Sequence, residues 1–139
     1  MRKHILLVDD DLSVQRLVTL TLGTADFDVV VAGDGATALA HAFSRTPDLI
    51  LLDVMMPDMD GFAVATALRS RPATVGVPII MLTARGSSDD LARSQALGIR
   101  EHFIKPFSPL HLLRTVYEIL DETLPPTSAI IRRLAEGGD

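Results

Sequence analysis

Short apolar runs alternate along the chain with stretches in which apolar residues recur every three or four positions. A short continuous apolar run predicts a strand that is buried on both faces, whereas the wider spacing predicts a helix with one buried face. The predicted strands are residues 5–8, 27–31, 48–52, 77–82 and 102–104, and the predicted helices are residues 12–22, 35–44, 61–70, 87–97 and 109–123. This regular alternation predicts an α/β domain with a parallel sheet that helices cover on both faces.

Polar residues and a proline stand where several of these helices are expected to begin. Asp11, Asp60 and Ser108 each precede a predicted helix, and their side chains can accept hydrogen bonds from its first free amides. Pro109 occupies the first position of the last helix, where a missing N–H group costs nothing. These residues therefore support the helices that the apolar pattern predicts.

The chain has 139 residues, which is enough for one domain with a hydrophobic core. Pro125 and Pro126 interrupt the last helical pattern. We therefore expect residues 1–123 to form the domain, and residues 124–139 to be a C-terminal tail or the start of a linker.

Composition and charge exclude several classes of function. A net charge of −5 argues against direct binding of nucleic acid, which needs a basic surface. The absence of cysteine excludes thiol catalysis and zinc–thiolate sites. No stretch approaches the roughly 20 apolar residues that span a bilayer, and no signal peptide is visible. We therefore expect a cytoplasmic protein that does not enter a membrane.

The apolar run of residues 49–52 ends on the carboxylate of Asp53, and this is the first sign of a functional site. An unpaired charge beside a buried strand is expensive, so another group should compensate it. In open parallel sheets, sites form beyond the carboxyl ends of the strands. A parallel sheet would gather at one edge the polar residues that follow the predicted strands, which are Asp9, Asp10, Asp11, Asp53, Thr83 and Lys105.

Together these side chains suit the transfer of a phosphoryl group. Carboxylates within a few ångströms repel one another unless a cation joins them. Hard oxygen ligands, without cysteine or a well-placed histidine pair, favour Mg²⁺. Lys105 supplies a positive charge and Thr83 a hydroxyl donor. The carboxylate of Asp53 can be the nucleophile that forms an aspartyl-phosphate.

Four motifs occur in order at the expected strand ends, namely "ILLVDDD", "LILLDVMMPDMDG", "PIIMLTA" and "FIKPF". In these motifs and their spacing, the chain resembles the receiver domain of response regulators in two-component signalling, over about residues 3–122. The resemblance implies a flavodoxin-like (βα)5 fold, a doubly wound parallel sheet with strand order 2-1-3-4-5. It also implies a phosphoacceptor regulator rather than an enzyme in the usual sense.

The resemblance assigns roles to the acidic residues and their neighbours. Asp53 resembles the phosphoacceptor of the family. Asp9 and Asp10 resemble the acidic pair, with Asp10 in direct contact with Mg²⁺ and Asp9 acting mainly through water. The backbone carbonyl of Met55 is expected to complete the metal site.

The resemblance also assigns roles to residues after the third and later strands. Thr83 resembles the switch hydroxyl, and Lys105 resembles the lysine that pairs with the phosphoryl group. The bond between Lys105 and Pro106 is expected to be cis, as such prolines often are in tight functional turns. Pro57 and Gly61 are expected to shape the loop after the phosphoacceptor.

Two positions depart from the usual pattern of the family. His102 stands three residues before Lys105, where the family usually has the tyrosine or phenylalanine that rotates as a switch. A histidine can fill this place, but it titrates near neutral pH. Met55 is apolar at a position that tunes how water approaches the phosphoryl group. Because an apolar side chain cannot orient an attacking water, we hypothesise slow self-dephosphorylation.

The resemblance implies partners as well. A sensor histidine kinase or a phosphotransfer protein would donate the phosphoryl group. The face of the fourth helix, fifth strand and fifth helix would then be repacked for an unknown downstream protein. The same face could join two copies in a homodimer, with charges from Arg93, Arg100, Glu101 and Arg114. The chain is either a stand-alone receiver or a receiver from a longer protein.

Other interpretations of the same residues stay open. Taken singly, residues 9–11 can form a turn with a helix cap, Thr83 can be an ordinary strand residue, and Lys105 a solvated charge. The chain can be a docking module that no longer cycles phosphate. A phosphatase with an aspartyl-phosphate intermediate would need an acidic residue in place of Met55. A flavin or nucleotide carrier would need a glycine-rich phosphate loop after the first strand.

Overall fold

The computed structural model describes residues 2–23, 27–84, 86–99 and 101–120, together with Ile131, Arg132 and Ala135. Its strands are β1 (Lys3–Val8), β2 (Phe27–Ala32), β3 (Leu49–Asp53), β4 (Ile79–Thr83) and β5 (Glu101–Ile104). Its helices are α1 (Leu12–Gly23), α2 (Gly35–Ser44), α3 (Gly61–Arg69), α4 (Ser88–Ala96) and α5 (Pro109–Ile119). Strand and helix alternate from β1 to α5, as the apolar pattern predicts.

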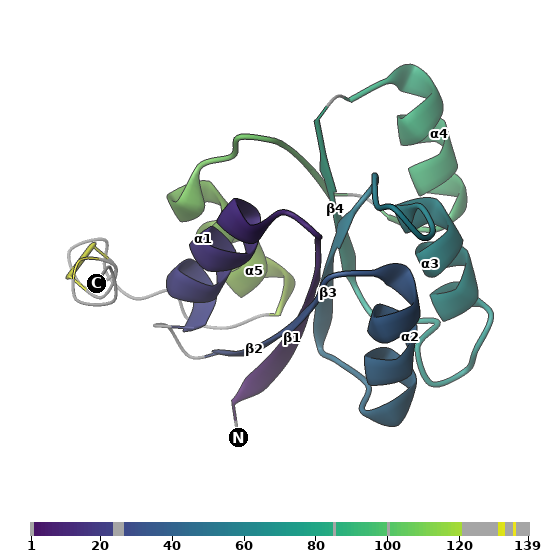
Figure 1. The fold of residues 1–139 in the computed structure, drawn as a ribbon, viewed down its shortest axis with the longest axis horizontal. Helices are drawn as coiled ribbons and strands as arrows, with labels where there is room; N and C mark the ends of the chain where they lie inside the picture. The colour runs from purple at the N-terminus through teal and green to yellow at the C-terminus, as the bar shows by residue number, and fades with distance from the viewer. Residues whose placement is uncertain are drawn as a thin grey trace.

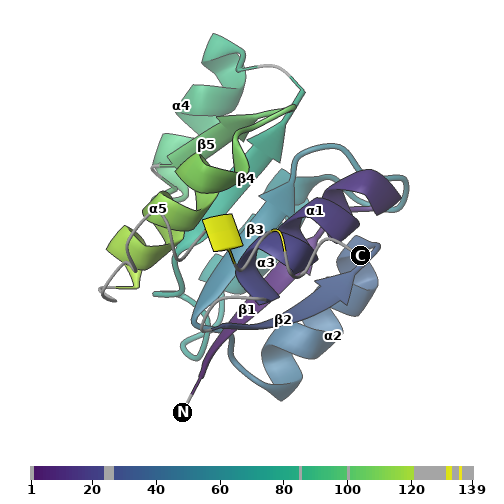
Figure 2. The same ribbon diagram turned by 90° about the vertical axis from the view of Figure 1, so that its left-hand side faces the viewer.

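The strands form one sheet in the order β2-β1-β3-β4-β5, and each pair of neighbours is parallel. Helices α1 and α5 cover one face of the sheet, and α2, α3 and α4 cover the other (Figure 1). In Figure 2, α1 and α5 lie in front of the sheet. The predicted doubly wound, flavodoxin-like fold with strand order 2-1-3-4-5 is confirmed.

Alternate residues of the buried strands point to opposite faces of the sheet and fill two separate cores. Ile5 and Leu7 of β1 belong to the core beneath α1 and α5, whereas Leu6 and Val8 belong to the core beneath α2 and α3. The residues of β3 and β4 divide in the same way. Each fully buried leucine contributes about 2 kcal/mol to folding. Burial on both faces explains why the apolar runs are continuous.

Side chains cap the helices where the sequence predicts them. Asp60 and Ser108 are the N-cap residues of α3 and α5, and each side chain accepts a hydrogen bond from the amide three residues later. Asp11 accepts from the amide of Ser13 at 2.8 Å. Asp34 caps α2 in the same way, although this cap was not predicted from the sequence. The caps fix the start of each helix beside the carboxyl edge of the sheet.

The ends of two strands differ from the prediction in a way that matters for the site. β4 begins at Ile79 rather than at residue 77, because Pro78 has no N–H group for the sheet and the amide of Val77 donates to the preceding turn. Asp53 and Thr83 are the last residues of β3 and β4, rather than the first residues after them. The sheet itself therefore holds both residues in place.

The last helix ends earlier than expected. α5 ends at Ile119 with Leu120 as its C-cap, whereas the sequence pattern predicts an end near residue 123. Residues 121–123 and most of the expected tail, residues 124–139, lie outside the described residues. In the part of the chain that the structure describes, no helix is long and apolar enough to cross a membrane.

Candidate functional site

Charged side chains from three strand ends meet at the carboxyl edge of the sheet. Nζ of Lys105 lies 2.8 Å from Oδ2 of Asp9 and 3.4 Å from Oδ1 of Asp53. Asp9 follows β1, Asp53 ends β3, and Lys105 follows β5. The parallel sheet thus brings together three of the residues that the sequence analysis singled out.

The two carboxylates that contact Lys105 are shielded from water. Asp9 is 0% exposed and Asp53 is 4% exposed. Burial and the charge of Asp9 raise the pKa of Asp53 to about 6, against the opposing charge of Lys105. Burial lowers the pKa of Lys105, but hydrogen bonds and charges from Asp9 and Asp53 outweigh burial and raise it above its usual value. The lysine therefore stays charged and faces two buried acids.

Asp10 adds a third carboxylate, and this donor set fits a magnesium ion. One oxygen from each of Asp9, Asp10 and Asp53 lies within 4.8 Å of the others. Asp10 is exposed whereas the other two are buried, so the cluster opens to solvent on one side. Oxygen donors with an open side suit Mg²⁺, which binds through few carboxylates and keeps several waters.

Met55 turns its backbone toward the cluster and its side chain toward solvent. Its amide donates a hydrogen bond to Oδ1 of Asp53 at 3.2 Å. Met55 is 71% exposed overall. The backbone of Met55 thus lies beside the carboxylates, where its carbonyl is expected to serve as a ligand.

The loop between β3 and α3 passes close to the backbone of Asp53. The amide of Gly61 donates to the carbonyl of Val54 at 2.8 Å. A Cβ atom on Gly61 would lie 2.3 Å from the carbonyl oxygen of Asp53, so only glycine fits this approach. This close approach agrees with a role of Gly61 in shaping the loop, which stays a prediction. Pro57 lies in the same loop and is exposed, and its role stays a prediction.

Hydrogen bonds also fix the Asp9 side of the cluster. Oδ1 of Asp9 accepts from the amide of Asp11 at 2.9 Å, and the side-chain amide of Gln15 donates to the Asp9 carbonyl at 2.7 Å. The amide of Asp9 donates to the carbonyl of Ala32 at 3.1 Å. Gln15 was not a candidate in the sequence analysis, because a single helical glutamine carries no signal of such a contact.

Thr83 ends β4, the strand that lies between β3 and β5. The residue is 4% exposed, and its carbonyl accepts from the amide of Lys105 at 2.7 Å. Thr83 therefore lies between the strand of Asp53 and the segment of Lys105. The peptide bond between Lys105 and Pro106 is cis, as the resemblance implies.

His102 lies half-buried on β5, next to α4. It pairs with Met81 in the sheet. It lines a hollow of about 400 Å³ whose other described lining residues are Leu91, Gln95, Gly98 and Ile99. Burial lowers the pKa of His102, against the charges of Asp90 and Glu101. A lowered pKa keeps the ring neutral at pH 7, so that it can occupy the place of an uncharged switch residue.

The charged residues expected at a dimer face differ from one another in their contacts and exposure. The guanidinium carbon of Arg93 lies 4.0 Å from the centre of the Phe62 ring on α3, so Arg93 makes a contact within the chain. Glu101 and Arg114 are exposed. Arg100 lies outside the described residues. A role of this face in a homodimer stays a prediction.

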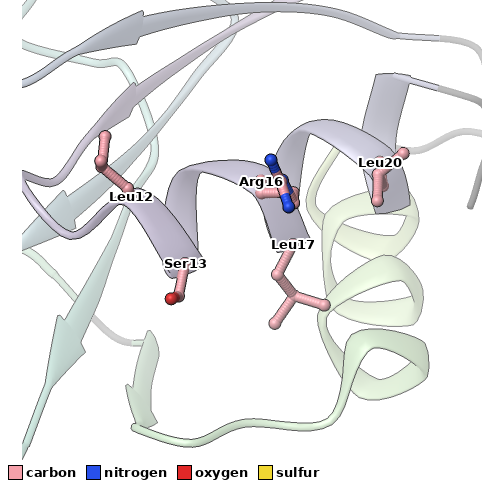
Figure 3. Close-up of a pocket in the computed structure, with 5 residues that line it drawn as sticks. All are labelled: Leu12, Ser13, Arg16, Leu17 and Leu20. Atoms are coloured by element: carbon pink, nitrogen blue, oxygen red, sulfur yellow. The ribbon is translucent and has the colours of Figure 1, made fainter. Parts of the chain in front are cut away.

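An apolar hollow of about 450 Å³ lies along α1, and no residue of the acidic cluster lines its described part (Figure 3). Its described lining residues are Leu12, Ser13, Arg16, Leu17 and Leu20. Leu12 is 77% exposed. A second hollow of about 320 Å³ shares Ser13 and Leu17 with the first and reaches Lys105. An apolar surface therefore leads from α1 to the edge of the charged cluster.

The fold and the charged cluster together define the class of this protein. The model of the response regulator receiver domain family matches residues 5–117, and the chain belongs to this family. Among solved structures, the chemotaxis protein CheY4 of Vibrio cholerae is similar, with a TM-score of 0.81 and 36% sequence identity. The similarity covers 86% of this chain and 99% of that chain.

Two curated relatives are longer proteins. The "Probable transcriptional regulator ycf27" of Cyanophora paradoxa is 40% identical over 126 residues, which are 91% of this chain and 52% of that protein. The DNA-binding response regulator MtrA of Mycobacterium tuberculosis (strain ATCC 25618 / H37Rv) is 42% identical over 116 residues, 84% of this chain and 50% of that protein. The chain thus spans about half the length of these relatives. It is a receiver domain of the two-component class, whose members are signalling regulators rather than typical enzymes.

Proposed function

We propose that the chain is a phosphorylation-dependent switch in which Asp53 accepts the phosphoryl group. The observation that carries the proposal is the contact of Lys105 with two buried carboxylates, Asp9 and Asp53. A purely structural ion pair needs one acid for one lysine, whereas three carboxylates share this edge. The surplus of negative charge suits a divalent cation, and the open side suits an incoming phosphoryl group.

In this proposal, Mg²⁺ is held by Asp10 directly, by Asp9 mainly through water, by Asp53, and by the backbone carbonyl of Met55. When bound, Mg²⁺ supplies positive charge that neutralises the phosphoryl oxygens. The proximity of the three carboxylates supports this ligand set. So does the hydrogen bond between the Met55 amide and Asp53, which brings the Met55 backbone to the carboxylates.

The residues of the chain would act on the phosphoryl group in complementary ways. An oxygen of ionised Asp53 attacks phosphorus, the bond from phosphorus to the donor histidine nitrogen breaks, and that nitrogen takes up a proton from solvent. Lys105 pairs with one phosphoryl oxygen, and the hydroxyl of Thr83 donates to another. Because the pKa of Asp53 is about 6, the nucleophile is ionised at neutral pH.

The donor in this proposal is a sensor histidine kinase or a phosphotransfer protein. A protein donor needs a surface beside the site on which it can dock. The apolar surface that runs from Leu12 and Leu17 to Pro106 and Phe107 borders Lys105 and offers such a surface.

Phosphorylation would then alter the face formed by α4, β5 and α5. Thr83 would move toward the phosphoryl group, and His102 would follow inward. The hollow that His102 lines against α4 provides space for a change in the position of its ring. The altered face would bind an unknown downstream protein or a second copy of the chain, as a two-state element can.

We also propose that residues 1–123 are the receiver unit, and that residues 124–139 are a C-terminal tail or the start of a linker. The family match ends at residue 117, and α5 ends at Ile119. MtrA is named as a DNA-binding regulator, but this chain covers only 50% of it. The net charge of −5 supports the proposal that these 139 residues do not themselves contact DNA.

The test is the intact mass of the protein after incubation with acetyl phosphate and Mg²⁺. We expect one phosphoryl adduct on the wild type, and none on Asp53→Asn or without Mg²⁺. A folded wild type that gains no adduct, either from acetyl phosphate or from candidate kinases, would refute the proposal.

The same assay followed over time measures the phosphoryl lifetime. Because Met55 is apolar, we expect slow loss, and a lifetime of seconds would contradict this part.

A further inference from the structure

Asp58 joins the loop after β3 to the beginning of α2. From the middle of this loop, Oδ1 of Asp58 accepts from the amide of Gly35 at 3.0 Å, and Oδ2 accepts from the amide of Ala36 at 3.1 Å. These amides belong to the first turn of α2, where helical N–H groups lack partners within the helix. Hydrogen bonds from backbone amides, that of Gly35 foremost, outweigh burial and hold the pKa of Asp58 below its usual value. The carboxylate therefore stays charged at the positive end of the helix.

Close packing accompanies these hydrogen bonds. A Cβ atom on Gly35 would lie 2.2 Å from Cγ and 2.7 Å from Sδ of Met59, so the next residue of the loop rests directly on Gly35. Met59 also packs against the core beneath α2 and α3. The loop therefore lies against α2 with no space for a side chain between them.

The Asp58 contact connects the two sides of the acidic cluster. The carbonyl of Ala32, shortly before α2, accepts a hydrogen bond from the amide of Asp9 at 3.1 Å. On the other side, Asp58 lies three residues after Met55, whose amide donates to Asp53. Asp58 therefore ties the segment that supports Asp9 to the segment that carries Met55.

We propose that Asp58 is a positioning residue of the phosphoacceptor site, which holds the backbone of Met55 in place through its contact with α2. This inference rests on the proposed function. Hydrogen bonds already hold the ends of the loop at Val54 and Gly61. A loop held only at its ends can turn a carbonyl away from the site. Fixing its middle removes that freedom in advance, so less conformational entropy is lost when a ligand binds.

The test compares Asp58→Ala with Asp34→Ala, a matched control at the same helix end. Asp34 caps α2 through the amide of Thr37 at 2.7 Å, from within its own segment. Titration of each protein with MgCl₂ is followed by amide NMR, and exchange of the Met55 amide is measured without metal. We expect Asp58→Ala to bind Mg²⁺ about fivefold more weakly, the size of one lost capping interaction. Its Met55 amide should exchange faster, whereas Asp34→Ala should change neither measurement.

A third variant, Asp58→Asn, separates position from charge. It keeps an acceptor oxygen and loses the negative charge, so we expect it to recover part of the lost affinity. Three results would overturn the inference: an Asp58→Ala protein that matches the wild type, an Asp34→Ala protein that is weakened equally, or an Asp58→Asn protein no better than Asp58→Ala. Failure of the wild type to bind Mg²⁺ would instead refute the proposed function, and the positioning role with it.

Discussion

The carboxylate of Asp53 ends an apolar strand, and its surroundings oppose its charge. Burial and the charge of Asp9 raise its pKa to about 6, although Lys105 lies 3.4 Å away. An anion that its surroundings stabilise poorly gains more from a bound cation and is more reactive as a nucleophile. The same features that make Asp53 costly for folding therefore suit it to accept a phosphoryl group.

Because the charged Asp53 carboxylate is costly for folding, we expect Asp53→Asn to stabilise the metal-free protein at neutral pH, by on the order of 1 kcal/mol. The folded-state pKa of Asp53 is raised above its ordinary value of 3.8, so the wild type gains stability as the pH falls through about 6 toward that value. The variant lacks this dependence, and the difference should close below about pH 4. Thermal unfolding of the wild type and Asp53→Asn in EDTA, across this pH range, measures the difference in stability. A variant less stable than the wild type at neutral pH would show that pairing with Lys105 dominates.

Some residues of the site could be predicted from the sequence and others could not. Asp9, Asp53 and Lys105 were identifiable because each directly follows or ends an apolar run, where a charge is unusual. Asp58 was not, because its partners lie 22 and 23 residues away in sequence and an aspartate is common in loops. Only the tertiary fold brings this carboxylate to α2.

Among the described glycines, Gly61 in the connection from β3 to α3 makes the closest approach to backbone atoms. A Cβ atom on Gly61 would lie 2.3 Å from the carbonyl oxygen of Asp53 and 3.0 Å from Cα of Val54. Both contacts are with backbone atoms, which cannot rotate away as a flexible side chain can. The start of α3 can therefore pass the end of β3 only where a side chain is absent.

We expect Gly61→Ala to lower the free energy of unfolding by about 2 kcal/mol and to weaken Mg²⁺ binding, because the loop must move away from Asp53. Gly76→Ala is the matched control, since a Cβ atom there meets nothing within 4 Å. Its effect should stay within about 0.5 kcal/mol. Urea unfolding of both variants measures the difference. Equal losses in the two proteins would mean that the close approach is not the cause.

The order and type of the elements were predictable from apolar spacing, but some of their ends were not. The apolar run of β3 stops at Leu52, so the pattern placed Asp53 outside the strand, whereas the sheet continues through it. Pro78 is compatible with an apolar strand pattern but not with donation to the sheet, so β4 begins at Ile79, two residues after the predicted start. Hydrogen bonds between neighbouring strands determine where these strands begin and end. The sequence of one strand alone does not show which of its residues form such bonds.

Across the whole molecule, the proposed site and the proposed output face are joined through β4 and β5. Thr83 ends β4 beside the charged cluster, and His102 on the neighbouring strand lines the hollow against α4. Helices α1 and α2 lie on opposite faces of the sheet, next to β1 and β2 (Figure 1). A signal that passes through Thr83 should therefore reach α4 and leave most of α1 and α2 unchanged.

We expect beryllofluoride with Mg²⁺, a mimic of the phosphoryl group, to change amide hydrogen exchange several-fold in β4, α4 and β5. The interior of α1 and α2 should exchange as before, because no moving residue contacts it in this proposal. Mass spectrometry of peptides measures both regions, with Asp53→Asn as the control that should not respond. A change confined to residues 53–61 would show that binding is not transmitted to the output face.

The two separate cores also matter for protein engineering. Leu51 and Leu52 are adjacent in the chain, yet they serve different cores on opposite sides of the sheet. One side could be recombined in a library while the other is kept as a fixed template. Asp9 and Asp53 lie at the strand ends, outside both cores. Such a library could therefore vary thermal stability without replacing any charged residue at the carboxyl edge of the sheet. Receiver domains could then be adapted to new host organisms by changing one core at a time.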